Sequence, residues 1–145
     1  MRLLRGLSRV EQDARPDGTL HPQARRGVFG DVPLETLQAR VRALGYEGQV
    51  VQVKGYFQDT LRTLPHERYS LVHLDVDLYG SYRTCLEYFY PRLQPGAYMV
   101  FDEYDFSAEV YPGAQRAIDE FLADKPERIE RFEEARHPRY FIRKA

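Results

Sequence analysis

The sequence predicts an α/β domain in which helices cover a mostly parallel sheet with an antiparallel edge at its C-terminal end. Three observations support this prediction. Apolar runs of strand length alternate with stretches of helical period along most of the chain. Two of these runs, at residues 69–78 and 97–101, flank a helical stretch and end in carboxylates, and the last two expected strands are separated by a turn only. With 145 residues, 43% of them hydrophobic, the chain is expected to bury one core.

The first part of the chain is expected to differ from the rest. Residues 9–30 contain several glycines and prolines among many charges, and they show neither helical nor strand period. We therefore predict an irregular N-terminal segment at residues 1–30 and a domain at residues 31–145.

The domain is expected to begin with a helix at residues 34–44, followed by a strand at 49–53 and a helical turn at 59–64. The helix carries an apolar stripe made of Leu34, Leu37, Val41 and Leu44. Such a stripe predicts a helix that faces the core.

The central stretch is expected to form a strand, a helix and a second strand. The apolar run at residues 69–78 ends with two carboxylates, Asp75 and Asp77. A helix is expected at 82–93, and the second run, at 97–101, stops at Asp102-Glu103. Two strands joined by a crossover helix in one sheet are parallel, so both acidic ends are expected at the same sheet edge.

Crowded carboxylates at one sheet edge indicate chemistry. A single aspartate after a strand often caps the next helix only. Four carboxylates at two neighbouring strand ends repel one another, so we expect them to share a metal ion or a proton.

After this stretch, an amphipathic helix is expected at residues 112–122, because its apolar residues recur at helical spacing. Two strands, at 128–132 and 139–143, follow with a turn around His137-Pro138. They supply the antiparallel edge of the predicted sheet.

The charge of the chain is nearly balanced, since 21 basic and 22 acidic residues give a formal net charge of -1. This balance offers no electrostatic basis for binding nucleic acid or an anionic membrane, so neither partner is expected. No apolar run approaches the roughly 20 residues of a membrane span. The lone Cys85 has apolar neighbours at helical spacing and is expected to be a packed thiol in a cytoplasmic protein.

Several motifs together resemble the macrocin O-methyltransferase family. They are residues 74–81 (LDVDLYGS), 86–87 (LE), 90–93 (YPRL), 95–96 (PG), 102–104 (DEY) and 112–122 (PGAQRAIDEFL). Upstream, residues 31–35 (DVPLE) and 54–61 (KGYFQDTL) match as well. The resemblance covers about residues 29–122, and the joint pattern is specific.

The resemblance implies a Rossmann-like class I methyltransferase sheet and an activity. Members of the family are metal-assisted enzymes that use S-adenosylmethionine to methylate sugar hydroxyls of natural products, so a small-molecule hydroxyl acceptor is expected. By position in the motifs, Asp75, Asp102 and Glu103 correspond to ligands of a divalent cation such as Mg²⁺, and Asp77 corresponds to the general base. Many members have aspartate where this chain has Glu103.

The resemblance also implies a partial domain. The family's first strand, its glycine-containing donor loop and its second strand have no counterpart in this sequence, which is therefore expected to be N-terminally truncated. Gly55, Tyr56 and Phe57 follow a strand and are expected to border S-adenosylmethionine. A plain turn is the alternative interpretation of these three residues.

Two other functions stay open. In the first alternative, the chain is a truncated, non-catalytic remnant or an interaction module. A second copy or a complementing chain then covers the open sheet edges. Alternatively, Asp75-Val76-Asp77 is the metal-chelating D-x-D of a glycosyltransferase that uses a nucleotide sugar.

Overall fold

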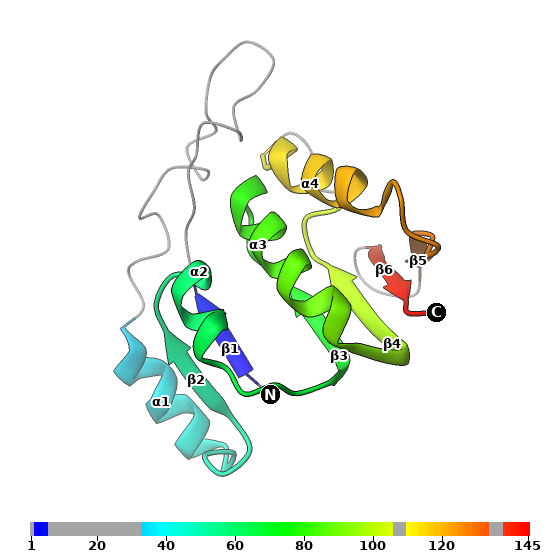
Figure 1. The fold of residues 1–145 in the computed structure, drawn as a ribbon. Helices are drawn as coiled ribbons and strands as arrows, with labels where there is room; N and C mark the ends of the chain where they lie inside the picture. The colour runs from blue at the N-terminus through cyan, green and yellow to red at the C-terminus, as the bar shows by residue number, and fades with distance from the viewer. Residues whose placement is uncertain (1, 6–32, 106–109, 134–137) are drawn as a thin grey trace.

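The computed structural model describes residues 2–5, 33–105, 110–133 and 138–145 (Figure 1). The helices are α1 (Leu34–Ala43), α2 (Phe57–Thr60), α3 (Tyr79–Phe89) and α4 (Pro112–Leu122), with short 3-10 helices η3 (Leu61–Thr63) and η4 (Tyr90–Arg92). The strands are β1 (Arg2–Arg5), β2 (Val51–Lys54), β3 (Tyr69–Leu74), β4 (Leu93–Phe101), β5 (Glu130–Phe132) and β6 (Arg139–Arg143). No helix within these ranges is long and apolar enough to cross a membrane.

The described strands form two sheets. β1 and β2 pair in parallel, and the larger sheet has the order β3-β4-β6-β5. In this larger sheet β3 and β4 are parallel, whereas β6 is antiparallel to both β4 and β5. The predicted α/β fold with an antiparallel C-terminal edge is therefore confirmed.

Strand β1 was not expected from the sequence. Residues 2–5 lie in the segment predicted to be irregular, yet they pair with β2 from Arg2 opposite Val51 to Arg5 opposite Lys54. These four residues begin and end with arginine, and their pattern is too short to indicate a strand. Strand formation here depends on pairing with β2. Residues 6–30 of the predicted irregular segment lie outside the described residues.

The core lies between the larger sheet and the helices α3 and α4, which pack side by side on one face of the sheet (Figure 1). Its fully buried side chains include Leu86 of α3, Ile118 of α4 and Met99 of β4. Alternation along β3 and β4 sends every second side chain to this face. On the opposite face the register partners Leu71 and Tyr98 are 62% and 42% exposed.

Helix α1 is not core-facing, contrary to the prediction. None of its residues is buried, and Leu44 at the end of the predicted stripe is 69% exposed. The neighbouring strand β2 has four residues, none of them buried. It offers too little apolar area to bury the stripe, which is therefore only partly covered.

The central strand, helix and strand are confirmed, with shifted ends. β3 stops at Leu74, so both aspartates that follow it lie in a connecting segment. α3 begins at Tyr79, before the predicted start of the helix at residue 82. β4 begins at Leu93, and the Gly96 N–H and Ala97 carbonyl both hydrogen-bond Lys144, which extends the antiparallel pairing with the β6 end of the chain.

Candidate metal centre

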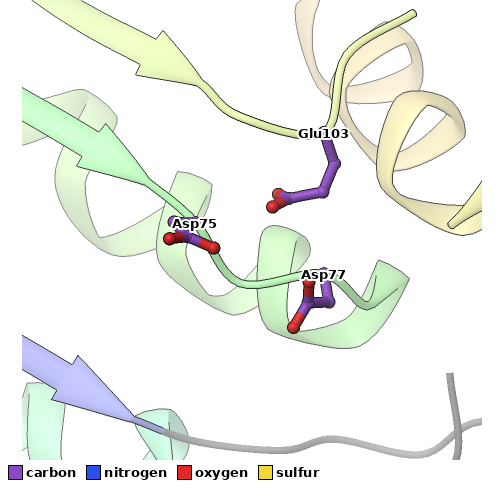
Figure 2. Close-up of side chains that lie close together, drawn as sticks. All are labelled: Asp75, Asp77 and Glu103. Carbon is purple, nitrogen blue, oxygen red and sulfur yellow. The ribbon is translucent and has the colours of Figure 1, made fainter. Parts of the chain in front are cut away.

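Three carboxylates converge at the carboxyl ends of β3 and β4. Asp75 and Asp77 lie in the segment after β3, and Glu103 lies two residues after β4. Each offers a ligand oxygen, and these three oxygens all lie within 4.8 Å of one another. Figure 2 shows Glu103 reaching from its segment toward the one that carries both aspartates. The parallel register, with Leu74 opposite Phe101, brings the two strand ends level.

The backbone at Asp77 adopts a rare conformation. Its φ is 59°, and the Leu78 N–H donates to the Val76 carbonyl at 2.6 Å across it. A hydrogen bond over three residues with positive φ at the centre is the strained form of γ-turn. Aspartate tolerates positive φ better than most residues, although the conformation still costs on the order of 1 kcal/mol. Strain of this kind is concentrated at functional sites.

Glu103 is a buried carboxyl group with only 4% of its surface exposed. The Tyr82 hydroxyl donates a hydrogen bond to its Oε2, and the Val76 N–H donates to the same atom at 3.4 Å. Burial raises the pKa of Glu103 to about 8 against the lowering effect of the Tyr82 hydrogen bond, and the charges of Asp77 and Asp75 also raise it. The buried Glu103 therefore favours a bound proton, or a cation beside it, over an uncompensated charge.

A second tyrosine contacts the cluster from the start of α4. Tyr111 is buried, and its hydroxyl is hydrogen-bonded to Asp77. Burial, followed by the negative charge of Asp77, raises the pKa of Tyr111 well above its ordinary value, so the hydroxyl stays protonated and donates. Asp77 thus has a fixed partner on the side of α4.

Asp102 is adjacent to Glu103 in the chain, but its side chain does not join the three clustered carboxylates. Arg139 of β6 donates from Nη1 to its Oδ1 at 2.7 Å, and Nε2 of His73 lies 3.4 Å from the same oxygen. The hydrogen bond with His73 and the charge of Arg139 lower the pKa of Asp102, and the same hydrogen bond raises the pKa of His73. Of the four predicted acidic residues, the structure therefore brings three together.

Both segments of the cluster are tied to α4. Tyr79, two residues after Asp77, donates from its hydroxyl to Glu120 at 2.6 Å. Tyr104, next to Glu103, donates to Asp119 at 2.7 Å. Neighbouring residues of one helix thus anchor the two acidic segments.

The family of the chain follows from comparison with known proteins. Residues 5–131 match the model of the macrocin O-methyltransferase (TylF) family. The chain belongs to this family. The match covers most of the chain and includes every residue of the acidic cluster.

Curated proteins that are more than 30% identical to the chain include two that cover most of it. The 8-demethyl-8-(2,3-dimethoxy-alpha-L-rhamnosyl)-tetracenomycin-C 4'-O-methyltransferase of Streptomyces olivaceus is 35% identical over 105 residues, which cover 71% of this chain and 40% of that protein. The mycinamicin III 3''-O-methyltransferase of Micromonospora griseorubida is 31% identical over 120 residues, which cover 80% of this chain and 45% of that protein. The chain thus spans less than half the length of these relatives.

Solved structures agree with the family. The O-methyltransferase NovP superimposes with a TM-score of 0.74 at 25% identity, over 99% of this chain and 60% of NovP. The calicheamicin methyltransferase CalS11 gives a TM-score of 0.74 at 24% identity, over 98% of this chain and 60% of that one. The fold is that of a class I methyltransferase.

The three residues predicted to border S-adenosylmethionine have different surroundings. Gly55 has a φ of 148°, and a Cβ added there would lie 2.6 Å from Cγ2 of Thr60, so the turn itself requires glycine. Phe57 is 3% exposed and belongs to the core, whereas Tyr56 is 44% exposed. Of these three residues, Tyr56 is the one whose side chain is accessible to a ligand. Their contact with the donor stays a prediction.

Sequence reasoning missed two residues of the site. Neither Tyr82 nor Tyr111 is among the site residues that the sequence predicts. A fully buried tyrosine usually needs a hydrogen-bond partner, and this rule indicates a polar neighbour for Tyr82. The contact of Tyr111 with Asp77 joins residues far apart in the chain, and no local pattern signals it.

Proposed function

We propose that this chain supplies the cation-binding and proton-accepting part of an O-methyltransferase that uses S-adenosylmethionine and acts on a sugar-type hydroxyl of a natural product. The observation that carries the proposal is the cluster of Asp75, Asp77 and Glu103 in a member of the macrocin O-methyltransferase family. The names of both curated relatives describe methyl transfer to an oxygen, and one names a rhamnosyl-bearing compound.

The residues present fit a divalent cation such as Mg²⁺. Such a cation prefers oxygen ligands and commonly binds through one or two carboxylates. The cluster offers three carboxylates, one of them buried with its pKa raised to about 8. When bound, the cation would supply positive charge that lowers the pKa of a substrate hydroxyl.

Each acidic residue has a proposed role. Asp75 and Glu103 would hold the cation, and a carboxylate oxygen of Asp77 would accept the proton of the acceptor hydroxyl. The loss of that proton makes the acceptor oxygen a competent nucleophile. Asp102, predicted as a further ligand, would have to leave its pairing with Arg139 to reach the cation.

The methyl donor would lie beside the carboxyl end of β2. When bound, S-adenosylmethionine would supply a methyl group carried on a positively charged sulfonium sulfur. The sulfur becomes a neutral thioether once the methyl group is transferred. We propose that the exposed ring of Tyr56 borders the donor. Gly55 has no room for a side chain and the ring of Phe57 is buried in the core, so these two residues would contribute backbone atoms only.

Calorimetric titration of Mg²⁺ into the purified chain tests the proposal. The wild type is expected to bind about one cation per chain, and Asp75→Asn is expected to weaken binding by at least about tenfold. Asp59→Asn, which makes the same change on the exposed surface of α2, is the matched control and should bind as the wild type does. Equal affinity of Asp75→Asn and the wild type would show that the site is assigned wrongly.

Titration of S-adenosylmethionine with and without Mg²⁺ separates this function from the alternative. Saturable donor binding, followed by transfer of a labelled methyl group to a glycosylated acceptor, supports the enzyme. Mg²⁺ binding with no donor binding would instead support a metal-binding interaction module. A cytoplasmic location stays a prediction and is tested by fractionation of the producing cells.

A further inference from the structure

We propose that Tyr82 and Tyr111 are positioning residues, whose hydroxyl groups hold Glu103 and Asp77 in the arrangement that binds the cation. This inference rests on the proposed function, since it concerns the same site. Neither tyrosine is one of the three clustered residues, which are Asp75, Asp77 and Glu103. Each contacts a different one of them, from a different helix region.

The hydroxyl proton of Tyr82 has two possible acceptors, and one of them is favoured. The side chain is 0% exposed, so the hydroxyl must be satisfied within the protein. Its two acceptor neighbours are Glu103 Oε2 and the Leu74 carbonyl, which lies 3.1 Å away. The Leu74 carbonyl already accepts the Asp102 N–H at 2.9 Å, which favours donation of the tyrosine proton to Glu103.

The contact between Tyr82 and Glu103 is reinforced by the backbone. The Glu103 N–H donates to the Tyr82 oxygen at 3.5 Å while the hydroxyl donates to the carboxylate of the same residue. The Tyr82 hydroxyl therefore contacts both the backbone N–H and the carboxylate of Glu103. This restricts rotation of a carboxylate that has no regular secondary structure on its own segment.

Tyr111 performs the corresponding task for Asp77. The γ-turn at Asp77 leaves the direction of its side chain to tertiary contacts, because no helix or strand hydrogen bonds fix this residue. Tyr111 is a buried residue at the N-terminal end of α4, and its hydroxyl is hydrogen-bonded to the Asp77 carboxylate. The packing of α3 and α4 therefore sets the separation of the two carboxylates.

The physical reason for such donors is electrostatic. Three carboxylates within a few ångströms repel one another and move apart unless other groups hold them. Each hydroxyl donates to a carboxylate, stabilises its charged form and removes rotational freedom before the cation binds. Loss of either hydroxyl leaves the ligands less well placed, so affinity falls.

Mn²⁺ binding, followed by electron paramagnetic resonance, tests the inference with single-atom changes. Tyr82→Phe and Tyr111→Phe each remove one hydroxyl and keep the ring. Each is expected to weaken Mn²⁺ binding by about tenfold and to alter the spectrum of the bound ion. Tyr90→Phe is the matched control, because Tyr90 also donates to a buried carboxylate, Glu127, at 2.5 Å, and Glu127 is not in the cluster.

The outcomes separate this inference from the proposed function. If Tyr82→Phe and Tyr111→Phe bind Mn²⁺ as tightly as the wild type while Asp75→Asn does not, the positioning role is overturned and the cation site stands. If the wild type itself binds no cation, both fail. At the same excess of Mn²⁺, the melting temperature of each phenylalanine variant should rise less than that of the wild type, because the stabilisation by a ligand falls as its dissociation constant increases. An equal rise would contradict the weaker affinity.

Discussion

Arg139 and Asp102 form a hydrogen-bonded ion pair in which Nη1 lies 2.7 Å from Oδ1. The pair joins the last strand to the end of β4, and His73 contacts the same oxygen of Asp102 from β3. A carboxylate that already pairs with an arginine and a histidine is a weaker candidate for a metal ligand than the three clustered carboxylates, for which no ion pair with a cationic side chain is found among the described residues.

We therefore expect Asp102→Asn to bind Mg²⁺ within about threefold of the wild type, while Asp75→Asn loses at least about tenfold. Calorimetry at one pH and ionic strength compares the two variants directly. An equal loss in both would mean that Asp102 exchanges Arg139 for the cation, as its position in the family motif implies.

Glu103 should make the cation-free protein less stable at high pH. Its pKa is about 8 in the folded chain and 4.5 ordinarily, so between these values the folded state keeps a proton that the unfolded chain has lost. The contribution of Glu103 to stability is then complete below pH 4.5 and is lost as the pH rises through 8. At pH 9 without cations, Glu103→Gln is expected to be more stable than the wild type by about 1 kcal/mol or more.

Urea unfolding at pH 5 and pH 9, in the presence of a chelator, measures this difference. Glu87→Gln, on the exposed side of α3, is the control and should follow the wild type at both pH values. A wild type whose stability does not fall between these pH values would contradict the raised pKa.

Glu127 should stabilise the protein with the opposite dependence on pH. Burial tends to raise its pKa, but hydrogen bonds from Lys144 at 2.6 Å, from Tyr90 and from the Ala145 N–H outweigh burial and lower the pKa to about 2. The contribution is complete above pH 4.5 and disappears as the pH falls through 2. Glu127→Gln is expected to lose about 2 kcal/mol at pH 7 and progressively less below pH 4.5.

Thermal unfolding across this pH range checks the expectation. Glu133→Gln offers a contrast, because that carboxylate is 66% exposed where it pairs with Arg131. The surface change should cost less than about 0.5 kcal/mol. A loss in Glu127→Gln that stays constant down to pH 2 would show that packing, and not charge, is responsible.

Gly55→Ala should destabilise the turn after β2. The φ of 148° disfavours any side chain, and the new Cβ would lie 2.6 Å from Cγ2 of Thr60. We expect a loss of about 1–3 kcal/mol. Gly48→Ala is the matched control, since no atom lies within 4 Å of its added Cβ, and it should stay within about 0.5 kcal/mol of the wild type. Equal stability of the two variants in urea unfolding would contradict this account.

Much of the fold followed from local pattern. The apolar runs that became β3 and β4 contain alternating buried residues, and the helix between them dictates parallel pairing, so the meeting of Asp75 and Glu103 could be predicted. Helix ends were displaced by a few residues because Tyr79-Gly80-Ser81 suit a turn as well as a first helical turn.

Features that depend on distant partners could not be predicted. Arg139 reaches Asp102 across 37 residues of sequence, and β1 exists because β2 lies beside it. The apolar stripe of α1 correctly indicated a helix, yet it could not reveal how little surface the helix would find to cover.

The hydrogen bonds of Tyr104 and Tyr79 to α4 connect both acidic segments to one helix. Asp119 and Glu120 are consecutive residues, and they hold the segments that follow β4 and β3 through Tyr104 and Tyr79. A local opening that displaces α4 frees both segments at once, so their amide protons should exchange with solvent at a common rate. We therefore expect fluctuations of this helix to shorten the time for which the three carboxylates stay assembled.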